Sequence, residues 1–145
     1  MESKDKERLV HAALQARAAA VAPYSRFPVG AALLTNAGAI VTGANVESAS
    51  FGLSCCAERV ALFKALTSGH KDFLALAVAA SVRGGVRPCG ACRQLLIEYA
   101  PQATLWLIDA DRPEEVYEFS IKQMLPEAFT DVPSLSAGQD GQKTS

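Results

Sequence analysis

The spacing of apolar residues predicts that the chain opens with a helix and continues into a hairpin. From residue 5 to residue 21 apolar side chains recur at three- and four-residue intervals, the period of an amphipathic helix, and Pro23 stops it. The apolar run 31–34, the glycine-containing turn 36–38 and the pair 40–41 predict a β-hairpin. The first third of the chain therefore mixes helix and strand.

The middle and the end of the chain predict two buried helices between strands. Residues 56–66 contain neither Gly nor Pro and are apolar almost all round, as a buried helix would be. The run 74–80 is continuously apolar and made mostly of small residues, which is typical of a central parallel strand buried on both faces. A second buried helix is predicted over 90–99, strands over 104–108 and 116–119, and a short helix over 121–125.

This order of elements predicts where three cysteines meet. Strand–helix–strand units cross over in a right-handed sense, which brings helix starts to the carboxyl edge of the strands, where open α/β sheets bind ligands. Cys56 opens one predicted helix, and Cys89 and Cys92 flank the start of the other. We therefore expect three thiols at one edge of the sheet.

Length and composition favour a single folded domain over residues 1–132. The chain has 145 residues, 50% of them hydrophobic, and no apolar run approaches the roughly 18 residues of a membrane span. Residues 133–145 are rich in Gly, Ser and Gln, so we expect a disordered tail. Residues 1–10 are charged and lack the apolar core of a secretory signal, so we expect a cytoplasmic protein.

The balance of charge disfavours a nucleic-acid partner. Lysine and arginine number 14 and aspartate and glutamate 15, which gives a net charge of -1. Proteins that hold polynucleotides through phosphates usually carry a basic stripe. We therefore expect neither a nucleic acid nor a membrane as the partner.

Four cysteines in a chain without an expected export signal indicate metal binding or catalysis, because reducing compartments keep thiols free. Cys55 has no spaced partner of its own and is expected to be a core residue. Cys89 and Cys92 have C-x-x-C spacing, which also suits a thioredoxin-like redox pair or half of a structural zinc site. His11 and His70 lie outside these motifs and are expected at the surface.

A third thiol favours a catalytic zinc over these alternatives. Cys56 would complete three protein ligands and leave the fourth tetrahedral position to water, as a catalytic zinc requires. Three thiolates and Zn²⁺ sum to a negative charge, and two helix N-termini together with Arg59 would compensate it. Glu58 lies two residues past a ligand, close enough to move protons without binding the metal, although acids are also common in a first helical turn.

Five segments resemble the small homotetrameric cytidine deaminases of the three-cysteine zinc type. They are CAER at 56–59, PCGACRQ at 88–94, YSRFPVGAAL at 24–33, NVE at 45–47 and MLPEAF at 124–129. The resemblance implies a three-layer α/β/α fold with a mixed five-stranded sheet and one zinc per subunit. It also implies hydrolysis of cytidine and deoxycytidine to uridine and deoxyuridine plus ammonia, as in pyrimidine salvage.

The resemblance implies a role for each matching residue. Cys56, Cys89 and Cys92 would be the zinc ligands and Glu58 the acid and base. The substrate-binding residues would be Phe27 as an aromatic wall, Asn45 and Glu47 at the ribose hydroxyls, Ala57 as a backbone donor, and Ala49, Phe51 and Phe129 from neighbouring subunits. Many members of that family carry Tyr where Phe51 stands, so a hydroxyl contact to the sugar would be missing here.

Three other functions stay open at this point. A non-enzymatic zinc-stabilised interaction module would need a closed fourth ligand and leaves Glu58 without a role. A deaminase of RNA or DNA would need a basic channel, which the near-neutral charge disfavours. A drug-modifying aminonucleoside deaminase of the same fold resembles the chain less at FPVG and NVE. Taken singly, Phe27 and Phe129 are also ordinary core aromatics and Asn45 an ordinary turn residue.

Overall fold

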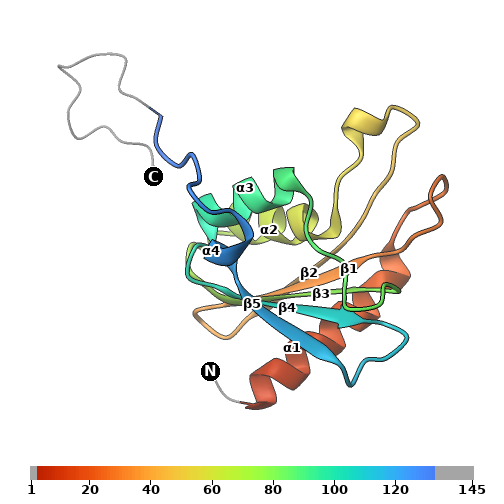
Figure 1. The fold of residues 1–145 in the computed structure, drawn as a ribbon, viewed down its shortest axis with the longest axis horizontal. Helices are drawn as coiled ribbons and strands as arrows, with labels where there is room; N and C mark the ends of the chain where they lie inside the picture. The colour runs from red at the N-terminus through yellow and green to blue at the C-terminus, as the bar shows by residue number, and fades with distance from the viewer. Residues whose placement is uncertain (1–2, 133–145) are drawn as a thin grey trace.

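The computed structural model describes residues 3–132, which form one five-stranded sheet between two layers of helices (Figure 1). The tail predicted over 133–145 lies outside the described residues. The helices are α1 (Ser3–Ala16), α2 (Ala57–Thr67), α3 (Gly90–Tyr99) and α4 (Ile121–Met124), with 3-10 turns η1 (Arg17–Ala19) and η2 (Phe51–Leu53). The strands are β1 (Gly30–Thr35), β2 (Ile40–Ala44), β3 (Phe73–Ala80), β4 (Thr104–Asp109) and β5 (Val116–Ser120).

The sheet is mixed, with the strand order β2-β1-β3-β4-β5. The predicted hairpin is confirmed as β1 and β2, which pair antiparallel, and β4 and β5 also pair antiparallel. The run at 74–80 is the central strand β3, but it runs parallel only to β4, because its other neighbour is β1 of the hairpin. β2 and β3 therefore run in the same direction on either side of β1, and α2 connects them.

Each face of the sheet is covered by its own helix layer (Figure 1). Successive residues of a strand point to opposite faces, so β1 sends Leu33 toward one layer and Leu34 toward the other. On one face α1 contributes Leu9 and Ala13 to a cluster with β1, β3 and β4. On the other face α2, α3 and α4 pack together, which confirms the α/β/α layering.

Helix α2 lies unusually close to the hairpin, and a glycine makes that approach possible. A Cβ atom added to Gly43 in β2 would lie 2.4 Å from the backbone nitrogen of Ala61, well inside contact distance. The absence of a side chain at Gly43 thus lets the helix rest on the strand backbone and fixes the height of its N-terminus above the sheet.

The expectation that residues 56–66 are buried on all sides is wrong for the described chain. Ala61, Leu62 and Ala65 are fully buried against the sheet, but the side chain of Phe63 is 42% exposed and Lys64 is exposed as well. The sheet can cover only one side of a helix, and the described chain provides no second layer above α2. Across residues 3–132, no helix has the length and apolarity needed to cross a membrane.

Candidate metal centre

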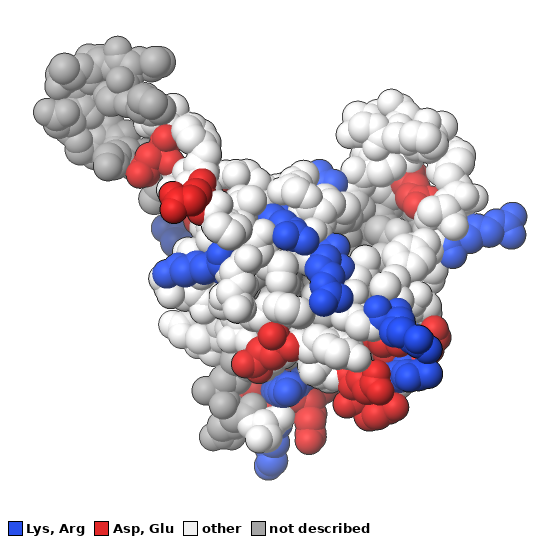
Figure 2. All heavy atoms as spheres, viewed as in Figure 1, with Lys and Arg blue, Asp and Glu red and all other residues white. Residues whose placement is uncertain are grey.

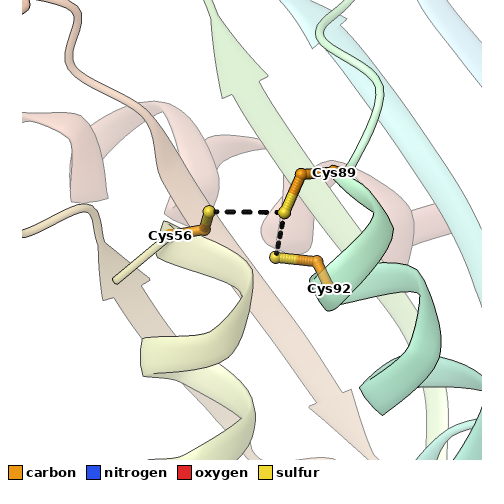
Figure 3. Close-up of side chains that lie close together, drawn as sticks. All are labelled: Cys56, Cys89 and Cys92. Carbon is orange, nitrogen blue, oxygen red and sulfur yellow. Dashed lines mark hydrogen bonds between the residues drawn. The ribbon is translucent and has the colours of Figure 1, made fainter. Parts of the chain in front are cut away.

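Three cysteine sulfurs gather where α2 and α3 begin (Figure 3). Cys56 is the N-cap of α2, Cys89 is the N-cap of α3, and Cys92 lies in the first turn of α3. The Sγ atoms of Cys56 and Cys89 are 3.7 Å apart and those of Cys89 and Cys92 are 3.5 Å apart. The ligand atoms of all three residues lie within 4.8 Å of one another. The predicted meeting of three thiols at one edge is therefore present.

The sulfur geometry fits a tetrahedral zinc ion. Two ligands at about 2.3 Å from zinc, separated by the tetrahedral angle, lie about 3.8 Å apart. The two short sulfur separations are close to that value, and neither N-cap side chain is used to cap its helix. A dithiol redox pair does not account for the equally close third sulfur of Cys56. The cluster is therefore suited to a metal with one position left for a fourth ligand.

Positive groups favour the thiolate form at this cluster. Two helix N-termini point toward the sulfurs, and Nη2 of Arg59 donates to Sγ of Cys56 over 3.4 Å. The Nε of Arg59 is buried and has no hydrogen-bond partner among the described residues. The neighbouring Cys92 thiol and then Arg59 hold the pKa of Cys56 well below its ordinary value. The hydrogen bond to Cys56, and then burial, raises the pKa of the Cys92 thiol.

Glu58 is buried in the first turn of α2 and stands apart from the sulfur cluster. Its side chain is 5% exposed, and it lines the same cavity as Cys56 and Cys89. Burial raises the pKa of Glu58 to about 7. A carboxyl group that titrates near neutrality can both take and release a proton at physiological pH. This environment supports the predicted separation of the carboxylate from the metal ligands.

A cavity of about 310 Å³ opens beside the cluster. Its lining residues are Ser25, Phe27, Val29, Asn45, Glu47, Cys56, Ala57, Glu58, Val86, Arg87 and Cys89. Six of the residues predicted to act on substrate or metal from within one subunit thus share one space with Glu58. A larger hollow of about 610 Å³ lies between α1 and the β4–β5 side of the opposite face, and none of the predicted site residues lines it.

Asn45 and Glu47 are engaged with the backbone of the segment 24–29. The Asn45 amide donates to the carbonyl of Phe27 over 2.9 Å and accepts from the N–H of Val29 over 2.8 Å. Glu47 Oε1 accepts from the N–H groups of Tyr24 and Ser25 at 3.1 and 3.0 Å. Residues predicted to bind sugar therefore also shape the pocket wall.

The segment 24–29 carries local backbone strain. Arg26, between Ser25 and Phe27, has a φ of 57°, in the left-handed region that residues with a Cβ seldom occupy. Such a conformation costs on the order of 1 kcal/mol or more and persists where surrounding bonds hold it. The bonds from Asn45 and Glu47 are of that kind, so the position of the Phe27 ring is set by side chains of the loop that follows β2.

Three predicted substrate residues lie outside the cavity. Phe51 in η2 is 78% exposed, Phe129 is 64% exposed, and Ala49 is exposed as well. None of them is among the residues that line the cavity of the described chain. Phe51 is carried by the loop 45–56, which projects beyond the sheet on the side where α2 begins (Figure 1). Within the described chain these three residues therefore contribute nothing to the cavity of their own subunit.

Sequence reasoning missed how α3 holds its surroundings. Arg93 Nε donates to the carbonyl of Pro88 over 2.7 Å, and its Nη1 donates to the carbonyl of Met124 over 2.9 Å. Gln94 Nε2 donates to the carbonyl of Phe129 over 2.7 Å. Arg93 and Gln94, which follow Cys92, thus hold the residue before Cys89 and the segment 124–129 by hydrogen bonds. No local pattern signals the contacts to Met124 and Phe129, because these acceptors are backbone carbonyls more than 30 residues away in sequence.

The remaining polar features agree with the composition. On the face seen in Figure 2, basic and acidic side chains are interspersed between large uncharged areas, and no continuous basic track crosses its described part. Cys55 is partly buried and is not among the three cysteines whose sulfur atoms gather at the helix starts. His11 is exposed and His70 half-buried, both outside the candidate site.

Comparison with known proteins gives a consistent result. The family model for the cytidine and deoxycytidylate deaminase zinc-binding region matches residues 3–108. A cytidine deaminase of Halalkalibacterium halodurans is 47% identical over 126 residues, which is 87% of this chain and 95% of that protein. Another, from Sporosarcina psychrophila, is 41% identical over 87% of this chain and 92% of its own length. The crystal structure of cytidine deaminase from Burkholderia pseudomallei superposes with a TM-score of 0.82 at 45% identity, covering 89% of this chain and 100% of that one.

Proposed function

The chain belongs to the cytidine and deoxycytidylate deaminase family, and from that premise we propose how its residues hydrolyse cytidine and deoxycytidine to uridine and deoxyuridine plus ammonia. It is a zinc-dependent hydrolase of a nucleoside. The observation that carries the proposal is the buried, near-neutral carboxyl of Glu58 in one cavity with two members of a three-sulfur cluster.

Cys56, Cys89 and Cys92 would hold the zinc through their thiolates. When bound, zinc supplies a Lewis acid that makes water a competent nucleophile near neutral pH. The separations of the sulfurs fit the ion, and Arg59 donates to Cys56 so that the excess negative charge of three thiolates is partly offset. Arg59 would thereby keep the site from becoming too electron-rich to act on water.

Glu58 would serve as the proton carrier. In its ionised form it takes a proton from the attacking water and delivers it to the ring nitrogen of the base. The oxygen of the water bonds to the carbon that bears the amino group. Glu58 then takes the remaining proton of that new hydroxyl and transfers it to the amino group, the carbon–nitrogen bond breaks, and ammonia leaves as the carbonyl of the uracil ring forms. A single carboxylate can perform both transfers because burial places its pKa near the working pH.

The remaining cavity residues would bind the nucleoside. Phe27 forms an aromatic wall for the pyrimidine, and the N–H of Ala57, which lies in the first turn of α2 where helical amides lack an internal acceptor, would donate to the ring carbonyl. Asn45 and Glu47 would hold sugar hydroxyls with the hydrogen-bonding capacity that their backbone contacts leave free.

We further propose a cytoplasmic homotetramer in which Ala49, Phe51 and Phe129 complete the pocket of a neighbouring subunit. Support comes from their exposure and from Phe63 on the outer face of α2, an aromatic side chain that is 42% exposed. Light scattering should give a mass near four times the 15.3 kDa of one chain. A fully active monomer would remove these three residues from the site.

The direct test of the proposed activity is ammonia release by the purified, zinc-loaded chain. Cytidine and deoxycytidine should be turned over, and cytosine and adenosine should be poor substrates, because the former lacks the sugar and the latter does not fit a pyrimidine pocket. Equal rates on cytosine and cytidine would show that Asn45 and Glu47 serve only the loop structure.

A further inference from the structure

The hydroxyl of Ser25 connects Phe27, in the wall of the cavity, with Glu47, which we propose to bind the sugar. Its Oγ is hydrogen-bonded to Oε2 of Glu47 and accepts from the backbone N–H of Phe27 over 3.0 Å. A peptide N–H can only donate, so a lone pair of the hydroxyl is used there and its single proton is directed to the carboxylate. The direction of both bonds is therefore fixed.

Counting acceptor sites shows what this bond does to Glu47. A carboxylate offers about four lone-pair sites, two on each oxygen. Both sites of Oε1 are taken by the N–H groups of Tyr24 and Ser25, and one site of Oε2 is taken by the Ser25 hydroxyl. One acceptor site is left, the second lone pair of Oε2. Because the Ser25 hydroxyl occupies the first lone pair of this oxygen, it determines the direction in which the free lone pair points.

Asn45 is left with a complementary capacity. Its amide has two N–H groups, and one of them is donated to the carbonyl of Phe27. A sugar hydroxyl can donate to one group while it accepts from another. Asn45 and Glu47 line the same cavity, so the two side chains retain one donor and one acceptor for such a hydroxyl.

We propose that Ser25 is a positioning residue that orients the free acceptor site of Glu47 for a sugar hydroxyl of the substrate. The proposal rests on the proposed nucleoside deaminase function and names a residue for which neither the sequence motifs nor the comparisons assign a role. Ser25 acts through Glu47 and transfers no proton in the reaction. Its second bond, to Phe27, ties the sugar contact to the aromatic wall, across the strained Arg26.

The test compares Ser25→Ala with Ser25→Thr, alone and in a Glu47→Ala background. Ser81→Ala is the matched control, because the Ser81 hydroxyl also lies between a carboxylate, that of Asp111, and a donor, Arg17, but Ser81 does not line the cavity. For each variant we would measure kcat and KM for cytidine, and the Kd of the product uridine by calorimetry, which needs no chemistry.

Ser25→Ala should weaken uridine binding and raise KM for cytidine by about tenfold, equivalent to about 1.4 kcal/mol. Ser25→Thr, which keeps a hydroxyl, should recover most of the loss, and Ser81→Ala should bind like the parent. In the Glu47→Ala background, removing the Ser25 hydroxyl should have less than a twofold effect, because the group it orients is gone.

Two outcomes would overturn the proposal. One is unchanged uridine binding in a folded Ser25→Ala variant of a chain that deaminates cytidine. The other is a Ser25→Ala effect of equal size with and without Glu47, which would assign the hydroxyl to backbone structure through Phe27 alone. If the parent chain itself released no ammonia from cytidine, the proposed function would fail, and this result is distinct from either outcome. If Ser25→Ala did not fold, Ser25→Thr and the uridine Kd would decide the question.

Discussion

On the metal side of the cavity the functional groups stand at the starts of two helices, whereas on the sugar side, where we propose that Asn45 and Glu47 bind the substrate sugar, they lie in loops. Cys56, Glu58 and Cys89 are placed by the backbone of α2 and α3, whose N-termini also supply positive potential. Asn45 and Glu47 instead reach across to another segment and are held by side-chain-to-backbone bonds. The first arrangement is rigid because helices are, and the second is rigid only while each bond is made.

This difference predicts that substitutions on the metal side abolish activity, whereas substitutions on the sugar side reduce it only in part. The metal side has one three-cysteine site for an ion and one buried carboxyl, and no other described residue can replace either, so the loss of a ligand or of the carboxyl is not compensated. On the sugar side several bonds fix the same segment, and removing one leaves the others. The following experiments test this contrast, beginning with the largest expected effect.

Cys92→Ala should eliminate zinc binding and deamination together. Cys92 is fully buried, and without it only two sulfurs remain for a metal that requires at least three protein ligands at a catalytic site. Elemental analysis should fall from about one zinc per chain to near zero. Cys55→Ala is the matched control, a neighbouring cysteine outside the cluster, and should keep both zinc and activity. Full activity in a zinc-free preparation of the parent would contradict the metal assignment.

Glu58→Gln should keep zinc and the fold while lowering kcat by at least about 10²-fold, the lower range for loss of a general acid and base. The amide preserves the shape of the side chain but cannot carry the proton. Steady-state kinetics would measure the fall in kcat, and elemental analysis of the same sample would measure the zinc content. Turnover close to that of the parent would make Glu58 an ordinary helix-start carboxylate.

Glu47→Ala should lower kcat/KM for cytidine and deoxycytidine together by about tenfold, since an unpaired polar group costs about 1–3 kcal/mol. The slow reaction of cytosine, which has no sugar, should change little. Glu47→Gln, which keeps one acceptor oxygen, should lie between the parent and the alanine variant. An equal loss on cytosine would show that the carboxylate serves only to hold the segment 24–29.

The smallest effect concerns the acidity of Glu47. The hydroxyl of Ser25, then the N–H of Ser25, lowers the pKa of Glu47 below its ordinary value. A carboxyl whose pKa is lower in the folded state stabilises that state above its unfolded pKa, and this contribution is lost as pH falls through the folded pKa. A carbon-13 NMR titration should therefore show Glu47 with a midpoint below that of an unperturbed glutamate, and Ser25→Ala should move the midpoint upward. An unchanged midpoint would show that the hydroxyl does not hold the carboxylate.

The metal side could be predicted from sequence because its signals are local. Cys89 and Cys92 lie one helical turn apart, and Cys56 and Glu58 are separated by a single residue, so forming the two helices is enough to orient them. The elements themselves followed from periodicity, and the predicted 90–99 helix has the bounds of α3. What failed was the burial of α2 on all sides, because periodicity reports apolar character and does not say what covers it.

The sugar side was assigned only through resemblance and stays a proposal, and its internal bonding could not be predicted from the sequence at all. Ser25 lies in one of the matching motifs, but the sequence assigned it no role. Its partner Glu47 is 22 residues away, so no short spacing indicates their hydrogen bond. The anchoring of the C-terminal segment by Arg93 and Gln94 was invisible for the same reason. For Arg93 and Gln94 the acceptors are also backbone carbonyls, which every residue type presents alike.

The sequence by itself determined the order of the elements, the helix starts that carry the thiols and the carboxyl, and the family to which these motifs belong. The reason is that helix periodicity and short spacings act within a few residues. The tertiary structure alone decided that β1 separates β2 from β3, that Gly43 lets α2 rest on β2, and that Glu47 grips the segment around Phe27. These features depend on contacts between distant segments, whose geometry is set only when the chain has packed.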